Sequence, residues 1–344
     1  MTPILSKTVL VQVVVSVLPV LVFLFALELI DTYKLLGIRR VMQMLAAGCA
    51  TAAACYFVNT SFYRLGVPPD PWARFGAPLL EEVAKGAWVC WLIRASRIGF
   101  MVDAAISGFA VGAGFAVLEN LLYVPDLAAA GFATAAIRGF GTAMMHGGAT
   151  AILGVVSVNR AEMRGVIWFD TFAPGLAIAV SIHTLYNQPV LPPVTKAVAL
   201  LILLPVLLSV VFWRSELALE RWVGTKLDKD IDLLQIIATG DFSSSHAGKY
   251  LRSLESAFGA LVLGDMLCYL QLSLELSAQA KGDLLRREMG FPVEKDPDQR
   301  VRLKELHYLE RQLGRAGKIA LTPLLGSSLR DIWDLHRMSK GSAA

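Results

Sequence analysis

The chain has 344 residues, of which 55% are hydrophobic and only 17% are charged. Its mean hydropathy of +0.56 is far above that of a soluble protein of this length, and its apolar residues occur in long runs. The formal net charge of +4 is too small, and the basic residues too scattered, to indicate a surface for nucleic acid. The composition therefore indicates a multi-pass membrane protein without a nucleic-acid partner.

Seven apolar segments are long enough to cross a bilayer, whose hydrocarbon core of about 30 Å needs a helix of roughly 20 residues. The first segment is too long for the core of a signal peptide and lacks a small-residue cleavage pattern after it, so we interpret it as a retained anchor helix. The predicted fold class is all-α, a polytopic helical membrane bundle followed by a helical soluble C-terminal domain. The predicted spans are residues 8–30, 41–57, 77–93, 104–124, 139–158, 168–186 and 190–213.

The distribution of charge divides the chain near residue 213. Residues 1–212 contain 13 Lys and Arg and 10 Asp and Glu, whereas residues 213–344 contain 19 and 18. Loops on the side of the C-terminus carry seven Lys and Arg against five on the opposite side, which favours a cytoplasmic C-terminus and a plasma-membrane location. We predict a polytopic membrane domain at residues 1–212 and a helical cytoplasmic domain, with a role in interaction or regulation, at residues 213–344.

One segment of the C-terminal domain, residues 255–277, resembles an eighth span. Asp265 and Glu275 interrupt its apolar runs, which favours a buried helix of a soluble bundle. Charged residues separate apolar ones at helical intervals on both sides of this segment, so amphipathic helices are expected there too.

Cysteines and glycines of the membrane domain are expected to have packing roles. The four cysteines show no metal-ligand spacing and are expected to be buried free thiols. Gly108 and Gly112 are four residues apart, as are Ala110 and Gly114, which predicts helix faces that allow close approach of neighbouring helices. The cysteines are Cys49, Cys55, Cys90 and Cys268.

The third predicted span carries Glu81, Glu82 and Lys85 near its centre. Each charge opposes insertion of a helix by about 2.5–3.5 kcal/mol, so the group is expected to have a use. Glu81 and Lys85, four residues apart, share one helix face and are expected to neutralise each other, whereas Glu82 is turned by about 100°. One carboxylate is then free to exchange a proton with water. The alternative is an interhelical salt bridge that holds the bundle together.

Three other apolar segments also carry polar groups. Glu119 is either a packing or ion-pathway residue or part of a site, and His146, flanked by glycines, is either a satisfied core histidine or accessible to a substrate. His183 and Asn187 are four residues apart and share one face, where they present an imidazole and an amide or form an interhelical hydrogen bond.

Together, these groups from four helices at comparable depth can converge only on one interior site. They include a general base, a proton shuttle and oxyanion donors, which are the parts needed to hydrolyse a peptide bond with water. An alternative is a proton- or cation-coupled transporter, but the sequence lacks the paired broken helices typical of one. A further alternative is a non-catalytic membrane receptor on the same fold, against which the complete set of motifs argues.

The motifs resemble those of a known family. EEVAK at residues 81–85, FAVLEN at residues 115–120, a histidine at 146 and HTLYN at residues 183–187 resemble the EExxK, FxxxE, H and HxxxN/D pattern of the PrsW intramembrane proteases. That family is similar in turn to the CAAX prenyl endopeptidases and the bacterial CPBP proteins. The resemblance implies an intramembrane endopeptidase and covers roughly residues 75–190.

The resemblance also implies roles for single residues. Either Glu81 or Glu82 would activate the attacking water, and Lys85 would orient or neutralise the pair. Glu119 stands where the prenyl endopeptidases carry a histidine that assists the base.

Two histidines and the amide complete the set of roles. Either His146 or His183 would take over the proton shuttle. His183 and Asn187 would stabilise the oxyanion.

The same resemblance bears on whether a metal is needed. The prenyl endopeptidase relatives resemble metal-independent glutamate proteases, so no cofactor is expected to be required. The alternative is a zinc site, in which Glu82, His146 and His183 are the ligands and water takes the fourth position. The substrates implied by the family are single-pass membrane proteins, for example an anti-sigma-like factor.

Overall fold

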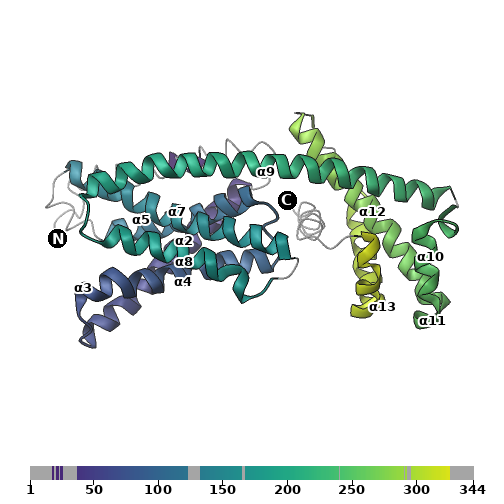
Figure 1. Ribbon diagram of the computed structural model, residues 1–344, viewed down its shortest axis with the longest axis horizontal. Coiled ribbons are helices and arrows are strands. Elements are labelled where there is room, and N and C mark those ends of the chain that lie inside the picture. The colour runs from purple at the N-terminus through teal and green to yellow at the C-terminus, as the bar shows by residue number, and fades with distance from the viewer. Residues whose placement is uncertain are drawn as a thin grey trace. The chain divides into compact units, whose positions relative to one another are not determined.

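Every regular element of the described residues is a helix in the computed structural model (Figure 1). The structure describes isolated positions between 18 and 25 and residues 37–122, 132–164, 167–239, 241–289, 291–292 and 296–325. The chain separates into two compact units, Met1–Ser215 and Glu216–Ala344.

The first unit is built around one central helix. Residues 102–116 of this helix, α5, are all buried, as expected for a helix that is apolar on every side. It packs against α2 and α7, and α7 packs against α8. The helices of this unit are α2 (Ile38–Arg64), α3 (Pro69–Pro71), the π-helix η1 (Trp72–Gly76), α4 (Ala77–Arg94), α5 (Met101–Leu122), α7 (Phe132–Arg164), α8 (Phe169–Asn187) and the beginning of α9 (Pro193–Ala238).

Small residues set the distances between these helices. A Cβ atom on Gly112 would lie 2.2 Å from the carbonyl oxygen of His146, and one on Gly114 would lie 1.9 Å from that of Leu45. The predicted close approach at these positions is therefore confirmed. Its consequence is that α7 lies directly against α5, with His146 at the point of contact.

Among the residues that the structure describes, five helices are long and apolar enough to cross a membrane. Four of them coincide with predicted spans and lie in α2, α5, α7 and α9, so the prediction of an all-α, multi-pass membrane protein is confirmed. The fifth is Ala260–Arg286 of α12, which we had expected in a soluble bundle. Helices α4 and α8 form where spans were predicted but do not meet the same criterion of length and apolarity, and the predicted span at residues 8–30 lies largely outside the described residues.

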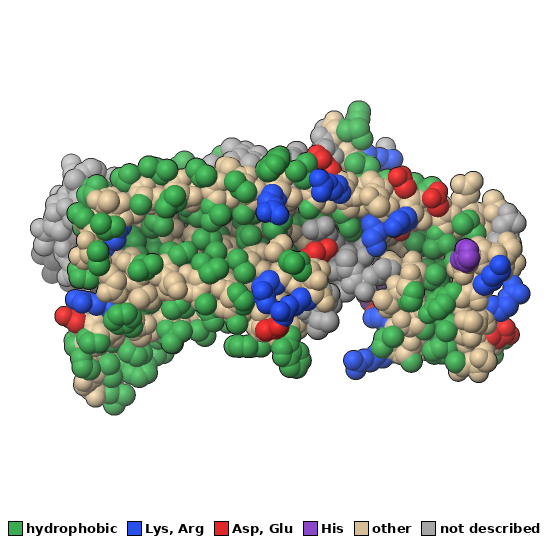
Figure 2. Space-filling model, in the orientation of Figure 1, with side chains coloured by type: hydrophobic (Ala, Val, Ile, Leu, Met, Phe, Trp, Pro, Cys, Tyr) green, Lys and Arg blue, Asp and Glu red, His purple; other side chains and the backbone are tan. Residues whose placement is uncertain are grey.

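An exposed apolar surface covers the first part of α9. Figure 2 shows hydrophobic side chains along its first part, and Val198, Ile202 and Val206 are each about half exposed or more. A contiguous apolar surface of this kind suits contact with lipid. All four cysteines are free thiols, as predicted, but of these only Cys55 is buried, whereas Cys49 and Cys90 are half-buried and Cys268 is exposed.

The second unit contains the end of α9 and the helices that follow it. Helices α12 and α13 pack against each other over a core that includes Met266, Leu276 and Leu306. A buried ion pair joins Lys281 Nζ to Asp230 Oδ2 at 2.6 Å. The helices of this unit after α9 are η2 (Asp241–Ser243), α10 (His246–Ser253), α11 (Glu255–Phe258), α12 (Ala260–Glu288) and α13 (Gln299–Leu325).

Candidate active site

Four helices of the first unit bring six of the seven predicted site residues into one group, in which hydrogen bonds join five side chains and Glu81 lies 3.9 Å from His183. We call this group the acid–histidine cluster. Three members lie on α4, and α5, α7 and α8 each contribute one. The members are Glu81, Glu82, Lys85, Glu119, His146 and His183.

Glu82 is the buried centre of the cluster. Its side chain has no exposed surface, and its Oε1 accepts hydrogen bonds from Lys85 Nζ at 2.6 Å and from His183 Nδ1 at 2.8 Å. The predicted pairing of Lys85 with Glu81 is therefore wrong. On a helix, residues three apart are neighbours just as residues four apart are. Here Glu82, three residues from Lys85, is the carboxylate that points toward α7 and α8. Glu82 thus fixes both Lys85 and the ring of His183.

His146 lies between a cation and a second carboxylate. Its Nδ1 is 2.7 Å from Lys85 Nζ, and its Nε2 is 2.7 Å from Glu119 Oε2. Because an ammonium group only donates, Nδ1 is assigned as the acceptor and Nε2–H as the donor to Glu119. The ring also contacts Phe115, with centroids 4.8 Å apart. His146 is therefore completely buried, and both of its ring nitrogens are engaged.

His183 connects Glu82 to Glu81. Its Nδ1–H donates to Glu82, which leaves the lone pair on Nε2, 3.9 Å from Glu81 Oε2. The rings of His183 and His146 meet edge to face, with centroids 4.7 Å apart. His183 therefore presents an acceptor nitrogen to the same space as one oxygen of Glu81.

Glu81 is the more accessible of the two adjacent carboxylates. Its side chain is 11% exposed, and its Oε1 accepts a hydrogen bond from Asn59 Nδ2 at 3.1 Å. Asn59 lies near the end of α2 and was not singled out in the sequence. The only signal for it there was a polar side chain just after the apolar run of the second predicted span. Glu81 thus has one oxygen fixed and the other directed to His183.

Asn187 is the predicted site residue that the described contacts do not bring into the cluster. Its Nδ2 donates to the carbonyl oxygen of Ala73 at 2.9 Å. This bond ties the end of α8 to η1, the segment directly before α4.

Three residues of the cluster are suited to hold a metal ion. One donor atom from each of Glu81, His146 and His183 lies within 4.8 Å of the other two. Two histidines and a carboxylate are a common ligand set of catalytic zinc, with water in the fourth position. This group contains Glu81, whereas the predicted set contained Glu82, which here accepts hydrogen bonds from Lys85 and His183.

The surroundings of both histidines fit that ligand set. Metal-binding histidines usually donate the other ring N–H to a carboxylate, which fixes the ring and its tautomer. Here Glu119 accepts from His146 and Glu82 accepts from His183. Lys85 contacts the second nitrogen of His146, so it has to move aside for that nitrogen to coordinate a metal.

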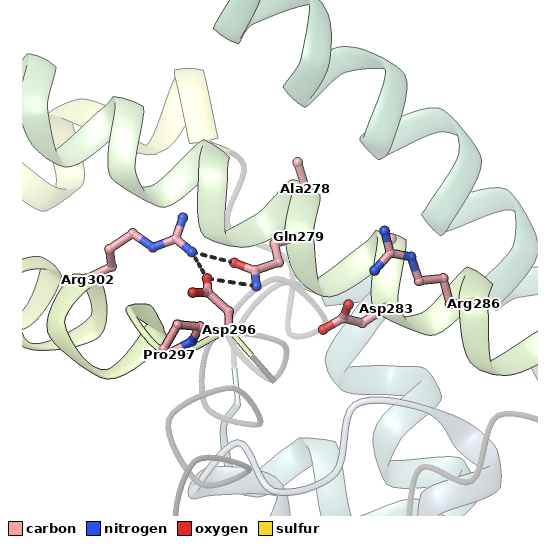
Figure 3. A pocket seen from close by; sticks show the side chains of 8 residues that line it. Ala278, Gln279, Asp283, Arg286, Asp296, Pro297 and Arg302 are labelled. Carbon is pink, nitrogen blue, oxygen red and sulfur yellow. Dashed lines mark hydrogen bonds and ion pairs between the residues drawn. The ribbon is translucent and has the colours of Figure 1, made fainter. Parts of the chain in front are cut away.

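A separate cavity of about 540 Å³ lies in the second unit (Figure 3). Asp296 there accepts hydrogen bonds from Gln279 and Arg302, and Asp283 and Arg286 lie further along α12. The described lining residues include no histidine, serine or cysteine. Asp296 is engaged by Gln279 and Arg302, whereas the acid–histidine cluster brings two histidines and three carboxylates together, so the cluster is the candidate active site.

A comparison with protein families identifies the chain. The model of the PrsW family, described as intramembrane metalloproteases, matches residues 35–213. The chain belongs to the PrsW family. The match contains every residue of the acid–histidine cluster, and no curated protein and no solved structure matches the chain.

The family description bears on the cofactor of this PrsW protein. It names a metalloprotease, which favours the alternative with a metal over the expectation that none is required. The donor set of Glu81, His146 and His183 agrees with that description.

Proposed function

We propose that this PrsW protein is an intramembrane endopeptidase that hydrolyses a peptide bond of a membrane-protein substrate. The observation that supports this most strongly is the meeting of Glu81, His146 and His183 from three helices, with their donor atoms within 4.8 Å of one another. Ionisable groups are costly among membrane helices, and they mark functional sites there. A structural salt bridge would need only one pair of charges, whereas this cluster joins six side chains.

Glu81 is proposed as the general base. The 3.9 Å between its Oε2 and His183 Nε2 allows a water molecule to lie at about 2.8 Å from both atoms. Glu81 would accept a proton from this water as the water attacks the scissile carbonyl, and would pass the proton to the leaving amine. Its partial exposure gives access to water, which the fully buried Glu82 lacks.

The other members of the cluster are proposed to hold the reacting groups in place. Glu82 fixes the ring of His183, and Glu119 fixes the ring of His146. Lys85 balances the charge of Glu82 and contacts Nδ1 of His146. The role of His183 and Asn187 as oxyanion donors stays a prediction. In the assigned tautomer, Nε2 of His183 carries a lone pair and cannot donate, and the amide of Asn187 already donates to Ala73.

Glu81, His146 and His183 are also the residues proposed to hold a divalent metal such as zinc, in which case Glu81 would be a ligand and the ion would activate the water. When bound, the ion would polarise the substrate carbonyl and acidify a water molecule. Lys85 would then be displaced from His146 but would keep its ion pair with Glu82.

The proposed setting is the plasma membrane, with seven spans and a helical cytoplasmic unit after α9. Substrates are proposed to be single-pass membrane proteins, for example an anti-sigma-like factor whose cleavage starts a signal. Peptide bonds in helices are shielded by their own hydrogen bonds, so a segment that is easily unwound near the membrane surface is the expected target.

The test is cleavage by the purified full-length protein in detergent, with a panel of single-pass membrane proteins. Glu81→Gln is expected to reduce the rate by about 100-fold or more, since a general base contributes that much. Glu82→Gln and His183→Ala are each expected to reduce it by about 10–100-fold, since they hold the reacting groups in place. Glu220→Gln, at an exposed position of α9, is the matched control and should cleave like the wild type. Undiminished cleavage by all three cluster variants would overturn the proposal.

Metal dependence is tested in the same assay. A chelator is expected to abolish cleavage, and added Zn²⁺ is expected to restore it in the wild type but not in Glu81→Gln. Full activity in the chelator would refute the metal site and leave Glu81 as a base that acts alone.

A further inference from the structure

One contact to Glu81 comes from outside the family motifs. Asn59, on α2, donates from Nδ2 to Glu81 Oε1 at 3.1 Å. Within the described residues, this is the only hydrogen bond to the Glu81 carboxylate, since His183 Nε2 lies 3.9 Å from Oε2, beyond hydrogen-bonding distance. The orientation of the proposed base therefore depends on α2 as well as on its own helix.

The amide of Asn59 is itself held by Trp72. Trp72 Nε1 donates to Asn59 Oδ1 at 3.0 Å. Because an indole N–H only donates, the oxygen of the amide faces Trp72 and its NH₂ group faces Glu81. The indole thus determines which end of the amide Glu81 meets.

Trp72 is in turn fixed by its position in η1. Its ring packs against Phe62, with centroids 4.2 Å apart, and lies over Gly76, where a Cβ atom would be 2.2 Å from the ring carbon Cε3. A π-helical segment of this kind is rare and is frequent at functional sites. Only glycine at position 76 leaves room for the indole in this place.

We propose that Asn59 is a positioning residue for Glu81 and that Trp72 holds Asn59 in the required orientation. The terminal torsion of a glutamate is broad, so an unheld carboxylate would sample many orientations. With Oε1 bound to Asn59, Oε2 stays directed toward His183 Nε2, where the proposed water or metal has to lie. This inference rests on the proposed function of Glu81.

The test compares Asn59→Ala, Trp72→Phe and the double variant in the cleavage assay. Loss of a residue that orients a catalytic or metal-binding group costs about 10–100-fold in activity or metal affinity. Asn59→Ala is therefore expected to lower kcat by that factor and to leave KM within about two-fold. Trp72→Phe keeps the ring on Phe62 but removes the N–H, and a smaller loss of kcat is expected.

Two matched controls separate positioning from packing. Trp88→Phe removes a similar indole bond, from α4 to Thr51 of α2 at 3.0 Å, that does not involve Glu81. Ser61→Ala alters a side chain near Asn59 that bonds only the Phe57 carbonyl within its own helix. Both are expected to keep the wild-type kcat. Because Trp72 acts through Asn59, the double variant should lose no more kcat than Asn59→Ala alone.

A readout with Zn²⁺ alone does not depend on catalysis. Competition with a chelating dye is expected to show about 10-fold weaker zinc binding in Asn59→Ala and unchanged binding in Trp88→Phe. Wild-type kcat and wild-type zinc binding in Asn59→Ala would overturn the positioning role, as would additive losses in the double variant. Failure of the proposed function looks different, because Glu81→Gln would then cleave and bind zinc like the wild type.

Discussion

Lys85 is the residue whose removal should disturb the acid–histidine cluster most. It has no exposed surface, and its ammonium pairs with Glu82 at 2.6 Å, contacts His146 at 2.7 Å and lies 4.8 Å from the ring centroid of Phe115. Lys85→Met keeps the length of the side chain and deletes all three polar contacts. Glu82 would then be a buried carboxylate with His183 as its one remaining donor among these partners.

The magnitude follows from that unpaired charge. Removing one partner of a buried ion pair costs about 3–5 kcal/mol, because the other charge stays in a medium that solvates it poorly. For a unit of this size, 1 kcal/mol corresponds to roughly 2–4 °C in Tm, so a decrease of roughly 10 °C is expected. The second change in Lys85→Met/Glu82→Gln removes the stranded charge. This double variant should therefore recover more than half of the lost stability while remaining inactive.

Thermal unfolding in detergent, followed by tryptophan fluorescence, measures both effects. Lys281→Met is the matched control, since Lys281 has the same kind of buried partner, Asp230 at 2.6 Å, in the second unit. It should also lower the Tm but should leave the cleavage rate per folded molecule unchanged. A Tm of Lys85→Met within about 2 °C of the wild type, or a double variant less stable than the single one, would refute the reasoning.

Three further predictions concern packing and the histidine partners. Gly112→Ala should unfold at a clearly lower temperature, because its Cβ would lie 2.2 Å from the backbone of α7. Gly282→Ala, whose Cβ would have no atom within 4 Å, should gain about 0.5–1 kcal/mol in free energy of unfolding. Equal shifts in the two variants would contradict this. Glu119→Gln keeps an oxygen that accepts from the histidine of α7, so in steady-state assays it should retain more kcat than Glu119→Ala, for which a loss of about 10–100-fold is expected. Leu276→Ala, at a fully buried position of the second unit, should cost about 2–5 kcal/mol in denaturant unfolding, and Leu261→Ala, at a 90% exposed position, almost nothing; similar values would argue against the described core.

The positions of the helices and the convergence of charges could be predicted from the sequence. Residues 77–93 and 168–186 were predicted as helices, and α4 and α8 begin and end within one residue of those limits. Buried charges on separate apolar segments have to meet, because each would be too costly alone in a membrane. This argument placed Glu119, His146 and His183 near the α4 carboxylates without any knowledge of packing.

The choice of partners could not be predicted in the same way. Two carboxylates lie within reach of Lys85 on one helix, and the rotation of α4 toward its neighbours decides between them. Asn59 contacts both Glu81 and Trp72 through tertiary structure, and neither Asn59 nor Trp72 has a spacing in the sequence that reveals this. The sequence predicts a span that ends at residue 213 but does not reveal that its helix continues beyond it. In the structure, α9 extends without a break to Ala238.

The formal charges of the acid–histidine cluster have a consequence for its occupancy. If all three carboxylates were ionised, with one ammonium and two neutral imidazoles, the cluster would carry an excess of two negative charges among membrane helices. A divalent cation would make the assembly electroneutral, whereas the empty cluster has to take up protons to reach the same balance. Metal binding and proton release should therefore be coupled, and zinc affinity should fall as the medium becomes more acidic.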